Sequence, residues 1–127
     1  MSVKVKVLDD IVVIYAKGMF TGGKETDELE HALDTAYVEG FKKVVVNLKN
    51  ATYMSTPGIS ALVKARKGFM EAGGRVVLSN VNDRINQVFV VTKLILVFET
   101  YETEAEAIES FEDWVAPEAE EVVTGAQ

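Results

Sequence analysis

The sequence of 127 residues contains no cysteine and only one histidine, His31. Disulfides, thiolate metal sites and cysteine nucleophiles are therefore excluded, and so is a metal site built on several histidines. No apolar run reaches the about 20 residues that cross a bilayer, and the start, MSVKVKVLDD, lacks the longer apolar segment of a secretory signal. We therefore expect a cytoplasmic protein without membrane insertion, metal or cofactor.

Basic residues are missing from the last part of the chain. All 13 lysines and arginines lie within residues 1–98, whereas residues 99–127 hold 10 of the 20 acidic residues. The clustered basic surface of a nucleic-acid binder is not present, so direct binding to nucleic acid is not expected. The short acidic ending, APEAEEVVTGAQ, predicts a mobile tail over residues 116–127 that follows a single domain over residues 1–115.

The apolar pattern along the chain indicates an α/β fold. Alternating valines and lysines over 3–7, a turn at Asp9-Asp10 and a strand over 11–18 predict an opening hairpin. Helical spacing predicts helices over 24–38 and 57–72, a short helix capped by Asn82, and a last helix that starts at Thr103, which with Glu106 has the spacing of a capping box. Strands over 42–48, 75–80 and 95–98 lie between them. We therefore predict a mixed sheet, mostly parallel after the hairpin, with about four helices packed on it.

The apolar positions of these segments predict a single core between the sheet and its helices. The second helix is expected to turn its apolar side chains, including Met70, inward. The side chains expected in this core are Val44, Val45, Val46, Ile59, Leu62, Val63, Phe69, Val76 and Val77.

The segment NATYMSTPGISALV, residues 50–63, places two hydroxyl side chains between a strand and a helix. Pro57 suits the first helical position, which makes Thr56 the expected N-cap. A helix N-terminus also attracts anions through its free N–H groups and its dipole. A phosphate on Thr56 would therefore be compatible with the fold, and from the residues alone Thr56 is either a cap or both a cap and a switch.

Other candidate sites lack the partners that their chemistry needs. His31 lies within a predicted helix without a second metal ligand, and Gly22-Gly23 is not followed by the Lys-Ser/Thr of a phosphate-binding loop. An enzyme with Ser55 or Thr56 as its nucleophile would need a general base, and the only histidine lies in a distant segment. We therefore expect no enzymatic activity.

The order of elements, the segment NLKNATYMSTPGISALV and the ending FETYETEAEAIESF resemble a STAS domain of the anti-sigma factor antagonist class, over about residues 3–114. Such domains carry a motif close to D-S-S-G-L between a strand and the next helix. Aligned on the glycine, the corresponding stretch here is Ser55-Thr56-Pro57-Gly58-Ile59. The resemblance places Thr56 on the phosphorylated serine of the family, with Ser55 as the alternative acceptor.

The resemblance implies a regulator of transcription. It would bind an anti-sigma factor of the serine/threonine kinase type when unphosphorylated and release it when Thr56 is phosphorylated. It would be a monomer or a weak dimer. The alternative is a STAS subunit of a lipid-transport or sensory assembly that binds its partner without phosphorylation. The implied partner-binding residues are Ser55, Thr56, Pro57, Gly58, Ser60 and Lys64.

Overall fold

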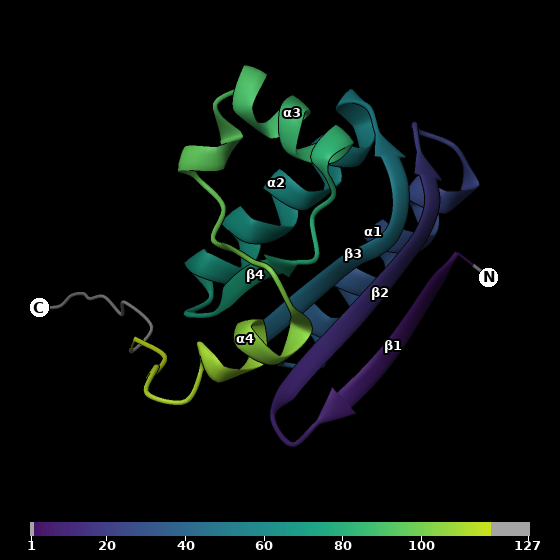
Figure 1. Ribbon diagram of the computed structural model, residues 1–127. Helices are drawn as coiled ribbons and strands as arrows, with labels where there is room; N and C mark the ends of the chain where they lie inside the picture. The colour runs from purple at the N-terminus through teal and green to yellow at the C-terminus, as the bar shows by residue number, and fades with distance from the viewer. Residues whose placement is uncertain (1, 118–127) are drawn as a thin grey trace, which may run out of the picture.

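A five-stranded sheet organises the chain, as the computed structural model in Figure 1 shows for residues 2–117, the part of the chain that the structure describes. The strands lie side by side in sequence order: β1 (Val3–Leu8), β2 (Ile11–Phe20), β3 (Lys43–Met54), β4 (Arg75–Ser79) and β5 (Thr100–Tyr101). The helices are α1 (Lys24–Val38), α2 (Thr56–Glu71), α3 (Asp83–Val91), the short 3-10 helix η1 (Leu94–Leu96) and α4 (Glu104–Glu109). The predicted α/β fold with four helices is confirmed, whereas most of the expected tail over 116–127 lies outside the described residues.

The sheet is mixed, as the sequence predicted. β1 runs antiparallel to β2, and the three pairs from β2 to β5 are parallel. The hairpin turns at Asp9-Asp10, where Asp9 has a φ of 56° and Leu8 pairs with Ile11. Asp10 also forms an ion pair of 2.8 Å with Lys43 at the start of β3. The turn therefore joins the opening hairpin to the parallel part of the sheet.

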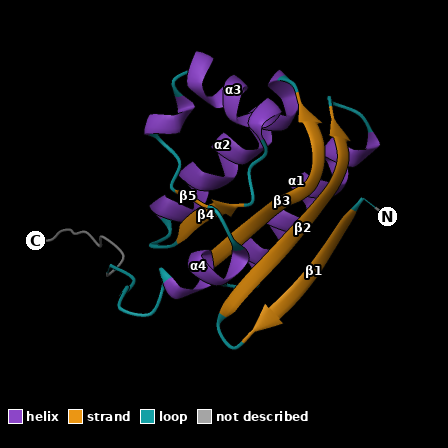
Figure 2. Cartoon of the chain, viewed as in Figure 1, coloured by secondary structure: helices purple, strands orange, loops and turns teal. Residues whose placement is uncertain are grey.

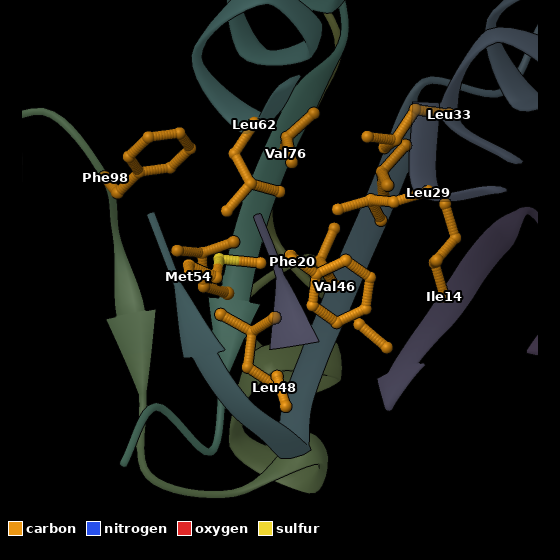
Figure 3. Close-up of a cluster of buried hydrophobic side chains, with 14 of the residues drawn as sticks. Ile14, Phe20, Leu29, Leu33, Val46, Leu48, Met54, Leu62, Val76 and Phe98 are labelled. Carbon is orange, nitrogen blue, oxygen red and sulfur yellow. The ribbon is translucent and has the colours of Figure 1, made fainter. Parts of the chain in front are cut away.

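Two cores, rather than the expected one, lie on opposite faces of the sheet. Successive side chains of a strand point to opposite faces, so Val44 and Val46 face α1, α2 and α3, whereas Val45 faces α4. Figure 2 shows α4 by itself on the near face of the sheet, with α1 behind it. Figure 3 shows Phe20 and Leu62 among the side chains of the larger core. The expectation of a single core was wrong because buried parallel strands are apolar on both faces.

α2 is in the expected register with two corrections. Ile59, Leu62 and Phe69 are buried, as predicted. Val63 is only partly buried, and Met70 is 51% exposed. Met70 directly follows the inward-facing Phe69, so the helical rotation of about 100° per residue turns its side chain toward solvent.

The predicted strand over 95–98 is wrong. Lys93 has a φ of 65°, which turns the chain into the 3-10 helix η1 directly after α3. The N–H groups of Val97 and Phe98 both donate to the carbonyl of Leu94, so they are not available to a sheet. The last strand forms instead at Thr100–Tyr101, which pairs with the end of β4.

β3 is longer than the predicted segment, because it continues to Met54. Its second half pairs with Lys17–Phe20 of β2 through two register shifts, which keep both strands in the sheet past Asn47, Lys49 and Asn50. The turn that carries the two hydroxyl side chains therefore begins only at Ser55, at the carboxyl end of β3.

A carboxylate holds α4 on its face of the sheet. Glu104, in the first turn of α4, accepts a hydrogen bond of 3.0 Å from the Tyr15 hydroxyl of β2. Its other oxygen accepts one of 2.9 Å from the Asn47 amide of β3. Thr103 caps the helix, as predicted, by accepting from the N–H of Glu106. One side chain thus connects the six-residue α4 to two strands of the sheet.

The environment of Tyr15 makes the stability of the fold depend on pH at alkaline values. Burial, followed by the hydrogen bond to Glu104 and its negative charge, raises the pKa of Tyr15 to about 12. In the unfolded chain the pKa returns to about 10, so unfolding releases a proton between these two values. The contribution of Tyr15 to stability is therefore complete below pH 10 and is lost as the pH rises toward 12.

We predict that Tyr15→Phe makes the free energy of unfolding less sensitive to pH above pH 10. Urea denaturation at pH 8, 9, 10 and 11 measures this, with Tyr53→Phe as the control, since the hydroxyl of Tyr53 makes no hydrogen bond within residues 2–117. The wild type and the control should lose stability in parallel between pH 10 and 11, and Tyr15→Phe should lose less. Equal slopes for all three proteins would contradict the assignment.

Candidate functional site

The candidate site begins where α2 starts, and the structure moves the predicted cap by one residue. The N-cap of α2 is Ser55, and Thr56 is the first helical residue. Ser55 is still extended, because its N–H donates to the carbonyl of Phe20 at the end of β2. Its own carbonyl accepts the first helical hydrogen bond, from Ile59 at 3.0 Å. The expectation that Thr56 is the cap was wrong because the sheet contact fixes Ser55 outside the helix.

The hydroxyl of Thr56 is therefore not used by the fold. No side chain forms a capping hydrogen bond at the start of α2. Thr56 is exposed, and its hydroxyl makes no hydrogen bond within residues 2–117. Ser55 is only partly exposed, since its backbone is held against β2. Of the two hydroxyl side chains, Thr56 is the more accessible.

Gly58 allows the first turn of α2 to pack on the end of β2. A Cβ atom at this position would lie 2.5 Å from the carbonyl oxygen of Phe20, which is closer than any real contact of that kind. Gly58 is buried, so it positions the helix and is not available on the surface as a contact residue. The loop before α1 completes this packing, because a Cβ at Gly22 would lie 3.2 Å from the ring of Pro57.

A groove of about 450 Å³ lies beside Thr56, between α2 and α3. Its walls join three of the predicted site residues, Thr56, Ser60 and Lys64, to apolar side chains from both helices. Sequence reasoning missed the opposite wall, which consists of Val88, Thr92 and Leu94. The available signal was the apolar run LILVF after Lys93, because a run of five apolar residues on a short segment cannot all be buried and its first residue, Leu94, lies in this wall.

The second wall is fixed to the body of the domain. Asn82 caps α3, as predicted, by accepting from the N–H of Ile85 at 2.9 Å. The amide of the same side chain donates to the carbonyl of Ala51 in β3 at 2.7 Å. One residue therefore both starts α3 and ties it to the strand that leads to Thr56, so the groove has a defined width.

Exposed apolar side chains extend the surface beyond the groove. α3, η1 and the residue after η1 present several large hydrophobic side chains to solvent, the most exposed being Leu96 at 83% and Val91 at 81%. An apolar surface of this kind beside a groove is a candidate interaction site. The other members are Val90, Ile95 and Val97.

The chemistry of the groove favours modification of a hydroxyl over catalysis by it. No histidine or carboxylate lines the groove, and Lys64 lies eight residues from Thr56 along α2, so none of these groups stands beside Thr56 as a general base. His31 is exposed on α1 and lines a different groove, together with β1. Within residues 2–117 no group of three or more potential ligands could hold a metal ion. In the same part of the chain, none of the helices has the length and apolar character needed to cross a membrane.

Comparison with known proteins finds similarity to one domain family. The sequence profile described as the STAS domain matches residues 2–107. The "Anti-sigma-B factor antagonist" of Staphylococcus aureus (strain NCTC 8325 / PS 47) is 31% identical over 67 residues, which are 53% of this chain. The matched segment spans 62% of the length of that relative, less than two-thirds of it.

Solved structures share the fold. An anti-sigma factor antagonist from Mycobacterium paratuberculosis superposes with a TM-score of 0.74 and 19% identity, over 87% of this chain and 93% of the other. The Bacillus cell fate determinant SpoIIAA in its phosphorylated form gives a TM-score of 0.70 with 20% identity, over 87% of this chain and 99% of the other. At these identities the two structures support the fold alone.

We predict that Gly58→Ala destabilises the protein although alanine is the better helix former. The added methyl group has to displace the backbone of β2, which should cost about 1–3 kcal/mol of unfolding free energy. Gly68→Ala is the matched control in the same helix, because a Cβ at Gly68 meets no atom within 4 Å. That control should gain about 0.5–1 kcal/mol. Chemical denaturation measures both, and a stabilised Gly58→Ala would show that the contact with Phe20 does not constrain the helix.

We also predict that Thr56→Ala leaves the free energy of unfolding within about 0.5 kcal/mol of the wild type, as for an exposed side chain without partners. Asn82→Ala, at a true cap, should cost about 1 kcal/mol or more under the same conditions. A loss of similar size for the two variants would show that Thr56 does act as a cap.

Proposed function

Because the chain belongs to the STAS domain family, we propose that it is a cytoplasmic anti-sigma factor antagonist that is switched by phosphorylation of Thr56. In its unphosphorylated form it binds the anti-sigma factor through the start of α2 and the α2–α3 groove, and this releases a sigma factor for transcription. The observation that carries the proposal is the exposed hydroxyl of Thr56 at the rim of that groove.

The start of α2 is suited to a phosphate. α2 has 16 residues, and no acidic side chain lies in its first turn. The N–H groups of Thr56 and Gly58 have no acceptor within the helix, and the helix dipole places partial positive charge beside them. A phosphate adds about 1.5–2 negative charges at this position without opposing an existing one. The domain can therefore remain folded in both states of the switch.

The same charge would oppose binding of a partner. The groove beside Thr56 is lined by Ile59, Val63 and Leu94, and the exposed apolar side chains of α3 and η1 continue it. A partner that covers this surface must remove water from it and from the rim. Lys64, the cationic side chain of the groove, lies eight residues from Thr56 along α2. Enclosing a phosphate at the rim, away from that cation, is unfavourable because a buried charge loses its hydration. Phosphorylation thus weakens the complex without unfolding either protein.

Thr56 is favoured over Ser55 as the acceptor by its accessibility. A kinase has to reach the hydroxyl, and the backbone of Ser55 is bound to β2 by the hydrogen bond to Phe20. Thr56 is exposed and stands at the mouth of the groove, whereas Ser55 does not line it. Ser60, one turn further along α2, lines the groove too and supplies a matched control.

The proposal is tested with the kinase-type anti-sigma factors of the same organism. The purified protein is incubated with each of them and ATP, and the position of any phosphate is mapped by mass spectrometry. We expect phosphate on Thr56 in the wild type and in Ser60→Ala, and none in Thr56→Ala. Phosphate on Ser55 would move the acceptor by one residue and contradict the assignment to Thr56.

Binding to the same anti-sigma factors is measured in parallel by calorimetry. Thr56→Glu should weaken the complex by about tenfold or more, while the neutral variant Thr56→Gln, with a side chain of the same size, should weaken it less. Absence of phosphate on any residue, together with equal affinities for the wild type and Thr56→Glu, would refute the switch. It would support instead a STAS module that binds its partner without phosphorylation.

A further inference from the structure

β1 forms an open edge of the sheet, away from the site at Thr56. It pairs with β2 along its whole length, and no other strand of the described residues lies on its outer side. Figure 1 shows this edge at the margin of the molecule, with neither helix nor loop across it. The N–H of Ser2 donates to the carboxylate of Glu28 at 2.9 Å, which fastens the start of the strand to α1.

The outer edge of β1 carries free backbone hydrogen-bonding groups. The carbonyl of Ser2, just before β1, accepts a hydrogen bond of 2.8 Å from the N–H of Lys17 in β2. Ser2 and Lys17 are therefore a hydrogen-bonded pair of the antiparallel ladder. Such pairs alternate along an antiparallel ladder, which makes Lys4 and Lys6 the next residues bonded to β2. The N–H and C=O groups of the residues between them therefore point outward. These residues are Val3, Val5 and Val7.

The side chains along this edge are of two kinds, one on each face of the sheet. Val5 and Val7 are each 53% exposed on the face that carries α1. A groove of about 440 Å³ lies there between β1 and α1, lined by Val3, Val5 and Ala32 together with polar residues of the helix. On the other face Lys4 and Lys6 are exposed and form no ion pair within the described residues. The edge is thus apolar on one face and basic on the other.

A second copy of the chain fits this edge poorly. Two copies of β1 that pair antiparallel through their outward groups place valine opposite valine and lysine opposite lysine in each such register. Like charges directly opposite each other on neighbouring strands are destabilising, and lysines on an edge strand generally prevent this kind of pairing. A strand with acids in place of the lysines has the complementary charge.

We propose that β1 is a docking edge for an extended segment of a partner protein in which apolar and acidic residues alternate. The segment adds a sixth strand to the sheet, places its apolar side chains over the β1–α1 groove and its carboxylates beside Lys4 and Lys6. This groove shares no lining residue with the groove at Thr56, so the two surfaces can be occupied together. The inference does not depend on the switch at Thr56.

The experiment uses the full chain and two capped synthetic peptides, EVEVEVE and KVKVKVK, whose alternating pattern suits either strand direction. Titration is followed by the backbone amide signals in heteronuclear NMR. We expect EVEVEVE to shift the amides of residues 3–7 and the α1 residues of the groove, and KVKVKVK to shift neither. Binding of both peptides alike, or shifts that centre on α2 and α3, would overturn the proposal.

Two variants identify the groups responsible. Val5→Pro removes one outward N–H group and leaves the ladder with β2 unchanged, since proline is tolerated at such edge positions. It should abolish binding of EVEVEVE while the amide signals of β2 stay in place. The double variant Lys4→Glu, Lys6→Glu should bind KVKVKVK in preference to EVEVEVE. Its affinity for EVEVEVE should fall by about tenfold or more. If the double variant still preferred EVEVEVE to KVKVKVK, the proposal would be overturned, even if Val5→Pro failed to fold.

Two other occupants of the edge are tested with the same protein. Sedimentation velocity at NMR concentration would reveal a dimer, and a dimer that Val5→Pro dissociates would assign the edge to a second copy. Truncation after Pro117 removes the acidic segment 118–127. Shifts of the amides of residues 3–7 on truncation would assign the edge to that segment of the same chain. A dimer that Val5→Pro dissociates, or amide shifts on truncation, would contradict the proposal that the edge binds a strand of a partner protein. We expect neither result.

Discussion

The first turn of α2 lies so close to the end of β2 that position 58 has no room for a side chain. The carbonyl of Phe20 accepts a hydrogen bond from the N–H of Ser55, and the backbone of Gly58 passes over the same carbonyl. This double contact fixes where β3 ends and where the helix begins. It holds Ser55 outside the helix and leaves the side chain of Thr56 without a structural partner. The accessibility of that hydroxyl is thus a consequence of backbone packing.

The same contact sets the position of the groove. α2 leaves the sheet at an angle determined by Gly58, and α3 is tied to β3 by the two hydrogen bonds of Asn82. The two helices therefore diverge from fixed points, and side chains of both line the space between them. Under the proposed switch, a phosphate on Thr56 would add charge at the mouth of this space, where the backbone is held by these contacts. It would then act on the partner rather than on the fold.

The two faces of the sheet are covered unequally, and this creates the second surface. Three α-helices cover one face, whereas the six-residue α4 covers only part of the other and is held there by Glu104. Only Val3 of β1 is covered, and the rest of the strand extends beyond the helices, so Val5, Val7 and the two lysines remain exposed. An open sheet edge is usually a risk of aggregation, and the lysines of β1 reduce that risk by opposing self-pairing. They leave the edge open to a strand of opposite charge.

The sequence by itself determined the order of the elements, because apolar periodicity and turn residues are local properties. The hairpin at Asp9-Asp10, the cap at Asn82 and the stretch that carries Thr56 could all be predicted from it.

Only the tertiary structure decided that Ser55 rather than Thr56 precedes the helix. Local preference treats the two positions alike, and a contact with Phe20, 35 residues earlier in the chain, selects between them. The same holds for the strand expected over 95–98, where Lys93 turns the chain into η1 before a strand can form. The far wall of the groove, including Val88 and Leu94, was likewise decided by the tertiary structure, because the approach of α3 to α2 depends on packing between segments distant in sequence.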